Sequence, residues 1–539
     1  MDKALKMGKD SATGSFQLFI AKIVATFILA ISTIIIGTFI NDVDYGLYVV
    51  ALIPITTFLL FQDWGVGAAL TKYSANYRHS GEEENLRKII ISGLTFEIAT
   101  GLALTVLSLV LASLVATTIL GHPESGFLIS IGSVSILFTG LYTVCQAIFV
   151  GFERMRLTGF TLVLQAVMYC ALTPLLIFLG YGALGAIIGF TVSYVVAGII
   201  SVALLYFSIL RNLSPCKLNK FEITNNLKTL LDFGVPVAIA LLVSGVLMQF
   251  YSFMMAHYCD VAIIGHYKIA LNFSVFISFF TFPISTVLFP AFSKLDSKNE
   301  QSVLKAIFSS AIKYTSFFAI PATIAMMVMS APIINTLYGD KWFYSPFFLS
   351  LELIQYLFIA LGGLTNGTFL QGVGETKMLL KLRMFTLCMG IPLAFLLIPM
   401  LQIVGVIFTS LIASMPSIFI GIYWIWKRYN VRVDFKSSAK IFLASAIAGM
   451  ATYTFLSIFS ASAWIMLTIG AILFVLIYLI ATPLVRAVDQ NDINNLRVMF
   501  SGLGMVSKIL EIPLRIVEKP LKINLKRKND VQISPAQND

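Results

Sequence analysis

The sequence predicts an all-α polytopic membrane protein with fourteen candidate transmembrane helices. Of its 539 residues, 58% are hydrophobic and only 12% are charged, whereas a soluble globular protein carries about a quarter charged residues. The mean hydropathy is +0.90, and apolar runs long enough to cross a bilayer as helices recur along the chain. Most of the chain must therefore face lipid, where a helix satisfies its own backbone hydrogen bonds.

The predicted spans begin close to the N-terminus. The opening stretch, MDKALKMGKDSATGS, is polar, and the apolar run from Phe16 is too long for the core of a cleavable signal peptide. We therefore expect that run to be the first span. The fourteen predicted spans are 16–40, 47–70, 89–115, 128–150, 158–179, 183–208, 229–256, 264–289, 305–329, 346–370, 378–399, 403–426, 439–459 and 463–485.

Lysines and arginines fall almost entirely on one set of alternate connections. Of the 37 in the chain, 33 lie in the N-terminus, the C-terminal tail and every second loop, whereas Lys341 is the single one in the opposite loops. This asymmetry follows the positive-inside rule, so both termini are predicted to be cytoplasmic and the number of spans to be even. The net charge of +11 is therefore a signal of topology, and no nucleic-acid partner is expected.

Short motifs repeat at a nearly constant offset. The pattern G-x-Y-x-x-A occurs in YGLYVVA (45–51) and again in IGHYKIA (264–270), and Pro174 is matched by Pro392. The repeat predicts two six-helix lobes with the same orientation, a design that transporters use with a substrate site between the halves. The predicted parts are an N-lobe (1–212), a cytoplasmic linker (213–228), a C-lobe (229–430), two further helices (431–486) and a basic cytoplasmic tail (487–539).

The sequence contains no motif that indicates an enzyme. The outer loops are short apart from 116–127 and 330–345, and neither carries a carboxylate pair suited to acid–base catalysis. HExxH, P-loop and GxSxG motifs are absent, and the four histidines and five cysteines do not cluster at metal-binding or disulfide spacing. We therefore expect neither catalysis nor a cofactor or metal ion.

Polar residues inside the predicted spans are the candidates for function. An ionisable group there costs about 2.5–3.5 kcal/mol to insert, so its presence points to a role. In the first span, Lys22 and Thr26 belong to a polar stripe that also contains Ser15 and Thr33. Such a stripe should face a cavity or another helix. The alternative is that the Lys22 stem snorkels to the membrane surface.

Further polar residues lie on the first two helices of each predicted lobe. Lys268 and Asn272 are one turn apart on the eighth span, although Lys268 is near enough to the outer end for snorkelling to explain it. Gln249 lies on the seventh span and Asp63 on the second. Each alone is typical of a contact between helices. Together they predict a polar site, and we expect all four to contact substrate.

Glu97 and Lys313 occupy equivalent helices of the two predicted lobes, the third and the ninth. They form either one distant pair or a local pair each. We predict a substrate contact for Lys313 and ion coupling through Glu97 or Asp63.

Several stretches together resemble the polysaccharide transporter family. The sequence is identified as a member of this family, which belongs to the multidrug/oligosaccharidyl-lipid/polysaccharide (MOP) flippase superfamily and includes O-antigen-type flippases of lipid-linked oligosaccharides. Besides the two G-x-Y-x-x-A motifs, the resemblance lies in FQDWGVGAALTKYSANY (61–77), FPISTVLFPAFSKL (282–295), APIINTLYGDKW (331–342) and FLQGVGETK (369–377).

The resemblance implies two helix bundles around a central cavity lined by the first two helices of each lobe. Related flippases hold the phosphate of a polyprenol-linked sugar there with cationic residues, which implies phosphate contacts for Lys22 and Lys268. The last two spans are expected to form a groove for the lipid tail. The expected partners are a lipid-linked glycan, membrane lipids, and glycosyltransferases or a polymerase of the same pathway, with the protein itself a monomer.

The sequence departs from two patterns of the superfamily. No arginine lies deep in a predicted span, and the first span has no acidic residue, which argues against an antiporter of drugs and cations. We predict a flippase of the cytoplasmic membrane that moves polyprenyl-phosphate-linked glycan precursors by alternating access. Two alternatives stay open: a cation-coupled small-molecule exporter of the same superfamily, and a membrane protein or enzyme that transports nothing.

Overall fold

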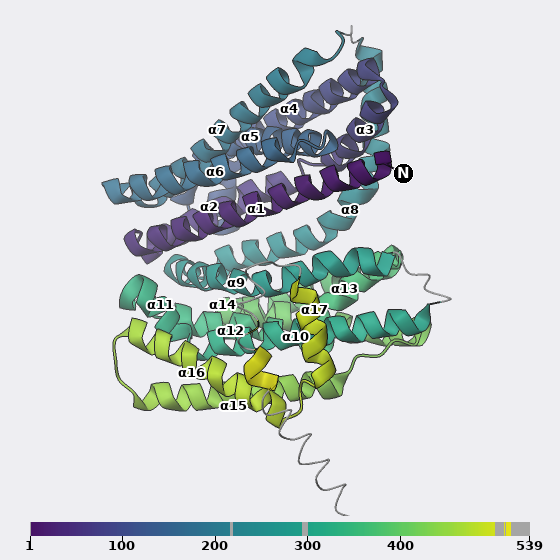
Figure 1. The fold of residues 1–539 in the computed structure, drawn as a ribbon. Coiled ribbons are helices and arrows are strands. Elements are labelled where there is room, and N and C mark those ends of the chain that lie inside the picture. Colours follow the sequence, from purple (N-terminus) through teal and green to yellow (C-terminus); the bar gives the residue numbers. More distant parts are fainter. Residues whose placement is uncertain (1, 216–218, 294–299, 502–510, 512–513, 519–539) are drawn as a thin grey trace, which may run out of the picture. The chain divides into compact units, whose positions relative to one another are not determined.

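The computed structural model is built of helices throughout the residues that it describes, which are 2–215, 219–293, 300–501, 511 and 514–518 (Figure 1). The end of the predicted basic tail lies outside these residues. The helices are α1 Asp2–Phe39, α2 Asp42–Leu60, α3 Val66–Ser80, α4 Glu83–Leu114, α5 Ser125–Gly151, α6 Met155–Leu176, α7 Gly182–Ser208, α8 Lys220–Tyr258, α9 Val261–Ser293, α10 Gln301–Val328, α11 Ser330–Tyr338, α12 Ser345–Leu357, α13 Gly363–Gly372, α14 Thr376–Tyr429, α15 Phe435–Ile458, α16 Ala463–Leu484 and α17 Gln490–Ser501.

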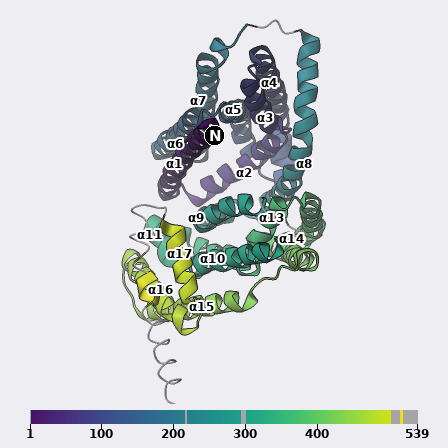
Figure 2. The ribbon, with the colours of Figure 1, turned by 45° about the vertical axis from the view of Figure 1, so that its right-hand side comes forward.

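The chain forms two compact units. The first contains Met1–Ile269 and Leu387–Thr409, and the second contains Ala270–Thr386 and Ser410–Asp539, so α9 and α14 contribute to both. In the first unit, α1 packs beside α6 and α6 beside α7 (Figures 1 and 2). In the second, α10 packs on α12 and α15. The lobe, linker and tail boundaries predicted from the sequence repeat stay a prediction.

Many of the helices are suited to a bilayer. Within the described residues, nine helical segments are long and apolar enough to cross a membrane, or up to eleven if each of two bent helix pairs is one span. Their outward faces carry large apolar side chains such as Phe27, Val110 and Phe178. The prediction of an all-helical, multi-pass membrane protein is confirmed. The number fourteen and the cytoplasmic position of the termini stay predictions.

Two of the nine segments, Met155–Asn212 and Thr376–Tyr429, bend part-way along their length. Each of them covers two of the predicted spans. Between α6 and α7 the chain turns at Gly180 and Gly182, whose φ angles of +90° and +46° suit glycine. In α14 the break is at Gln402, where φ is +52°. Thr386 precedes the break and Ser417 follows it, yet their hydroxyl oxygens are 2.5 Å apart. A straight helix would separate the two residues by about 46 Å. The chain therefore reverses at Gln402.

The predicted second span, 47–70, is broken in the structure. The helix α2 ends at Leu60 and α3 begins at Val66, because Gly65 adopts a left-handed φ of +80°. A Cβ on Gly65 would lie 2.1 Å from the carbonyl oxygen of Gly234 on α8. This close approach of two backbones requires glycine. The break leaves the residues at 61–65 outside a helix, and the candidate Asp63 lies there, next to Gln62.

The repeated G-x-Y-x-x-A motifs meet each other in the first unit. A Cβ on Gly46 of α2 would lie 1.8 Å from the carbonyl oxygen of Val261, and a Cβ on Gly265 of α9 would lie 2.4 Å from that of Asp42. The two contacts are equivalent by the repeat. Gly46 approaches the residue four positions before Gly265, and Gly265 approaches the residue four positions before Gly46. The motif glycines therefore allow the first turns of α2 and α9 to cross at backbone distance.

Candidate functional site

The polar stripe of α1 lies on a helix that exposes many large apolar side chains. Lys22 is exposed, and so are its neighbours Ile23 and Phe27. The hydroxyl of Thr26 donates to the carbonyl of Lys22 at 2.8 Å, and that of Thr33 donates to a carbonyl one turn earlier. These hydroxyls are therefore satisfied inside the helix. Lys22 places a positive charge on a lipid-facing helix, where it must reach a polar phase or an anionic ligand.

Gln249 of α8 joins two hydroxyls of α2. Thr57 Oγ1 donates to Gln249 Oε1 at 3.2 Å, and Gln249 Nε2 donates to Thr56 Oγ1 at 3.3 Å. An amide can donate and accept at once, which lets Gln249 bridge adjacent residues on a neighbouring helix. The contact links the helices that open the two predicted lobes, and it is also a stable contact between helices.

Lys268 lies three residues beyond the motif glycine Gly265 and is half-buried, whereas its neighbours in the chain, Tyr267 and Ile269, are buried. Asn272 follows one turn later on α9 and is also half-buried, and it belongs to the second unit. Both candidates are thus partly withdrawn from solvent, which distinguishes them from the exposed Lys22.

A buried carboxyl lies beside the break between α2 and α3. Glu97 of α4 is 1% exposed, and its Oε2 accepts a hydrogen bond at 3.3 Å from Nε2 of Gln62, which is also buried. Glu97 Oε1 and Gln62 Oε1 accept no hydrogen bond from any described residue. Two buried oxygens without a donor are costly. A proton or a cation on this pair would remove that cost.

Two glycines make room for this pair. A Cβ on Gly140 of α5 would lie 1.6 Å from Gln62 Nε2 and 2.9 Å from Glu97 Oε2, and a Cβ on Gly101 of α4 would lie 3.0 Å from Gln62 Nε2. The side chain of Gln62 therefore occupies space that any larger residue at position 140 would fill. The neighbouring Asp63 points elsewhere. It is exposed, and its carboxylate accepts from the Gly67 N–H at 3.3 Å at the start of α3.

Lys313 of α10 has a partner that the sequence analysis missed. Its Nζ lies 2.5 Å from Asp492 Oδ2 on α17, and Tyr314 donates to the other oxygen at 3.4 Å. Asn495 of α17 completes the group by donating to the Tyr314 hydroxyl at 3.0 Å. Glu97 and Lys313 thus each have a partner within their own unit, which was one of the two alternatives.

The position of α17 could have been found from its first residues. The Asp489 carboxylate accepts from the Asp492 N–H at 2.9 Å, and the Asp492 carboxylate accepts from the Asp489 N–H at 2.8 Å. This reciprocal pattern is a capping box, which marks the start of a helix. Burial alone would raise the pKa of Asp489, but the Asp492 N–H and the charge of Lys313 lower that pKa overall.

A family model described as polysaccharide biosynthesis protein matches residues 9–296. The chain belongs to this family. The matched segment contains every candidate residue named above except Lys313 and its partners on α17. The family membership predicted from the sequence motifs is therefore confirmed.

Curated relatives include proteins named as flippases. The probable low-salt glycan biosynthesis flippase Agl15 of Haloferax volcanii is 21% identical over 267 residues, which are 47% of this chain and 54% of that protein. The match thus spans about half the length of that relative. The lipid II flippase MurJ of Bacillus subtilis is 20% identical over 450 residues, which are 74% of this chain and 79% of that protein.

Solved structures share the fold. A lipid II flippase MurJ in an inward closed conformation superposes with a TM-score of 0.69 at 18% identity, covering 88% of this chain and 98% of that chain. An inward-facing multidrug resistance MATE family transporter of the MOP superfamily gives 0.63 at 19% identity, covering 77% and 98%. The chain therefore shares the fold of these two transporters, as the sequence motifs predict.

Proposed function

We propose that this protein is a flippase that moves polyprenyl-phosphate-linked oligosaccharide or polysaccharide precursors across the cytoplasmic membrane by alternating access. Such precursors supply the assembly of cell-surface polysaccharide or glycoprotein glycans. The observation that carries the proposal is the family match over residues 9–296, on a chain with many membrane-spanning helices. The relatives named as flippases support it.

The chemistry of the substrate explains why polar groups inside spans are needed. A charged, hydrated headgroup does not cross hydrocarbon without a polar path, because an ion or hydroxyl that loses its water must find other partners. Lys22 and Lys268 are proposed to contact the phosphate. Lysine is a compact point charge that forms charge-assisted bonds. Two such contacts suit a carrier, which must also release its cargo.

The neutral polar candidates are proposed to contact the glycan. Thr26, Gln249 and Asn272 can each donate and accept hydrogen bonds, as sugar hydroxyls require. Gln249 already bonds two hydroxyls of α2, so a sugar would replace those bonds rather than create an unpaired group. Asp63 and Lys313 are proposed as further contacts, with Lys313 exchanging its bond to α17.

Ion coupling is proposed for the Glu97–Gln62 pair, with Asp63 as the second acidic candidate. Two of the buried oxygens of the pair lack a donor among the described residues. Binding of a proton or a monovalent cation would satisfy them, and its release would make the carboxyl seek another partner. Such a switch can bias two conformations of the neighbouring break between α2 and α3.

The crossing of the two motif glycines, Gly46 and Gly265, is proposed as a contact that opens and closes during transport. It joins equivalent helices of the repeat, as alternating access between two related halves requires. Because the contact is between small residues, it can form tightly and separate with little loss of buried side-chain area.

The test is flipping of a fluorescent polyprenyl-phosphate glycan in proteoliposomes. Lys22→Gln and Lys268→Gln are compared with wild type and with Lys220→Gln, an exposed lysine at the start of α8. We expect wild type and Lys220→Gln to flip the lipid and the other two variants to lose about tenfold in rate each.

Two results would contradict the proposal in different ways. Normal flipping by both variants would remove the two lysines from the site but keep the function. A wild-type protein that flips no polyprenyl-phosphate glycan, yet exports small organic cations along an ion gradient, would replace the proposed function by that of an exporter.

A further inference from the structure

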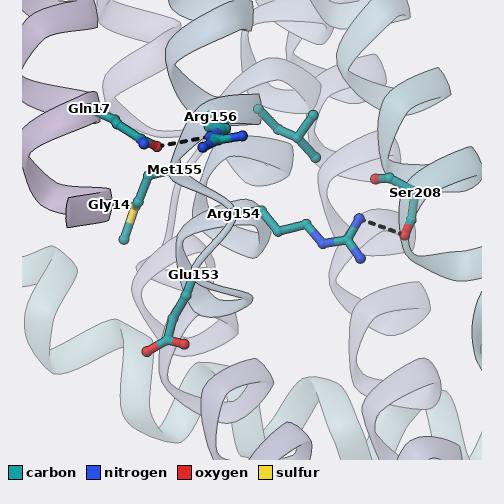
Figure 3. A pocket seen from close by; sticks show the side chains of 8 residues that line it. Gly14, Gln17, Glu153, Arg154, Met155, Arg156 and Ser208 are labelled. Carbon is teal, nitrogen blue, oxygen red and sulfur yellow. Dashed lines mark hydrogen bonds between the residues drawn. The ribbon is translucent and has the colours of Figure 1, made fainter. Parts of the chain in front are cut away.

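A pocket of about 450 Å³ lies in the first unit, and none of the candidates described above lines it (Figure 3). Its volume is in the range of roughly 300–1,000 Å³ that small-molecule sites have. The pocket is formed where three elements meet: the part of α1 that carries Gly14 and Gln17, the connection from α5 into α6, and the last residue of α7. The lining residues are Gly14, Gln17, Glu153, Arg154, Met155, Arg156, Leu157 and Ser208.

Two arginines give the pocket its positive charge. Arg154 donates from Nη1 to the carbonyl of Ser208 at 2.8 Å, and Arg156 donates from Nε to Gln17 Oε1 at 3.2 Å (Figure 3). Both partners are neutral. Each guanidinium has five N–H donors, so these bonds orient the two arginines and leave donors on each for an anion.

The acidic residue of the pocket is engaged by another arginine. Glu153 points away from Arg154 and Arg156 in Figure 3, and its carboxylate lies 3.5 Å from Arg78 Nη1. Arg78 also donates to the carbonyl of Phe152. Glu153 has a φ of +56°, a left-handed conformation that a non-glycine residue adopts at a cost. The Glu153 carboxylate is therefore engaged by Arg78 rather than by the two arginines of the pocket.

The backbone adds to the attraction for an anion. Met155 and Arg156 are the first residues of α6, a helix of 22 residues, and both line the pocket. The first N–H groups of a helix have no carbonyl partner inside it, and the helix dipole makes this end positive. The arginines and the helix end therefore act on the same space.

The surroundings of the pocket indicate a ligand that also enters lipid. The apolar span of α1 begins at Phe16, directly before Gln17. Phe16, Phe160, Tyr206 and Phe207 all lie within four residues of the lining and are exposed. Aromatic side chains gather where a protein meets the membrane surface, and basic pockets between helices at that level bind anionic headgroups.

We propose that this pocket binds the phosphate group of an anionic membrane phospholipid, with Arg154 and Arg156 as ligands and the acyl chains lying against the exposed aromatic residues. The positive-inside pattern assigns the pocket to the cytoplasmic leaflet. None of its lining residues is a proposed transport contact, so the site would be occupied whichever lipid-linked glycan is moved. A free phosphate has the same headgroup chemistry, but it would gain nothing from the aromatic surface.

The experiment measures lipid retention by native mass spectrometry on the full-length protein in a neutral detergent. Phosphatidylglycerol and phosphatidylcholine are offered at equal concentration, and inorganic phosphate is added in a third arm. Wild type should retain phosphatidylglycerol preferentially. Arg154→Gln/Arg156→Gln should bind it at least about tenfold more weakly, since each lost charge-assisted bond accounts for roughly that factor.

Two further variants make the result decisive. Arg211→Gln/Lys220→Gln removes the same charge from exposed positions of the same unit and should bind like wild type. Gln17→Glu is nearly isosteric and places a carboxylate beside Arg156 as an internal competitor, so it should lose phosphatidylglycerol even if the double arginine variant does not fold.

Three outcomes would overturn the proposal. One is retention by Gln17→Glu or by the double arginine variant that equals wild type. Another is an equal loss in the control variant, which would indicate general attraction to a basic protein. The third is full displacement of the lipid by millimolar inorganic phosphate, which would identify a free anion as the ligand.

Discussion

The two units treat a buried ionisable group in opposite ways. In the first, the carboxyl of Glu97 is 1% exposed and is hydrogen-bonded to the neutral amide of Gln62. In the second, Lys313 is paired with the opposite charge of Asp492, and the two side chains are 19% and 9% exposed. The sequence repeat places Glu97 and Lys313 on equivalent helices. Although their positions in the repeat are equivalent, Glu97 is paired with a neutral group and Lys313 with an opposite charge.

The difference teaches where a change of protonation is possible. A buried pair of opposite charges is already compensated, and separating its members leaves a charge without a partner. A buried carboxyl beside a neutral amide has no charge to compensate it, so it must hold a proton or a cation to remain there. We therefore expect Lys313 to hold α17 as long as substrate does not replace that bond, and Glu97 to respond to ions.

The largest effect should come from breaking the pair in the second unit. Lys313→Gln leaves the buried Asp492 carboxylate without a positive charge beside it, which should lower the free energy of unfolding by about 3 kcal/mol. Thermal unfolding in detergent measures the loss. The double variant Lys313→Gln/Asp492→Asn removes both charges and should be more stable than either single variant. Additive losses would show that the two residues do not interact.

Crowding the pair in the first unit should have the next largest effect. Gly140→Ala would place a Cβ 1.6 Å from Gln62 Nε2, and overpacking of this kind costs about 1–3 kcal/mol. Gln62→Ala should recover part of the loss when combined with Gly140→Ala. Gly367→Ala is the control, because its Cβ would meet nothing within 4 Å. Equal stability of both glycine variants would contradict the packing described for Gln62.

Glu97→Gln should change transport more than stability. The substituted amide keeps the shape of a protonated carboxyl, so the free energy of unfolding should change by less than about 1 kcal/mol. The pH dependence of flipping in proteoliposomes should become flatter than in wild type, because position 97 can no longer exchange a proton. Asp63→Asn is the comparison. If it flattens the profile and Glu97→Gln does not, coupling belongs to Asp63.

The smallest effect should be a weakening of the C-terminal contacts in acid. Hydrogen bonds from Arg497 hold the pKa of Glu511 below its usual value. A carboxyl with a lowered pKa stabilises the folded state above its ordinary pKa of about 4.3 and loses that contribution as the pH falls through its folded pKa. The loss should be under about 1 kcal/mol, since the groups are partly exposed. Limited proteolysis between pH 6 and pH 3 should cleave near α17 more readily in acid, and Glu511→Gln should abolish that change.

Some residues of the candidate site could be predicted from the sequence and others could not. The second span was predicted to continue through residue 70, with Asp63 as its polar group. The structure ends α2 at Leu60 and buries Gln62 while Asp63 stays exposed. Which of the adjacent residues Gln62 and Asp63 is buried depends on the path of the chain in the break between α2 and α3. Hydrophobic periodicity does not predict that path, because it carries information only within a helix or strand.

The sequence by itself determined the class of protein, its family and the repeat. Apolar runs in lipid must become helices because no other partner is available to the backbone, and the G-x-Y-x-x-A motif occurs twice in the printed sequence. That the two motif glycines cross was shown only by the structure. Only the tertiary structure decided the partners of Glu97, Lys313 and the two arginines of the pocket. Those partners come from other elements, at separations that range from 35 residues for Gln62 to 179 for Asp492. Which side chains meet at such distances is set by how the helices pack, and no local pattern encodes it.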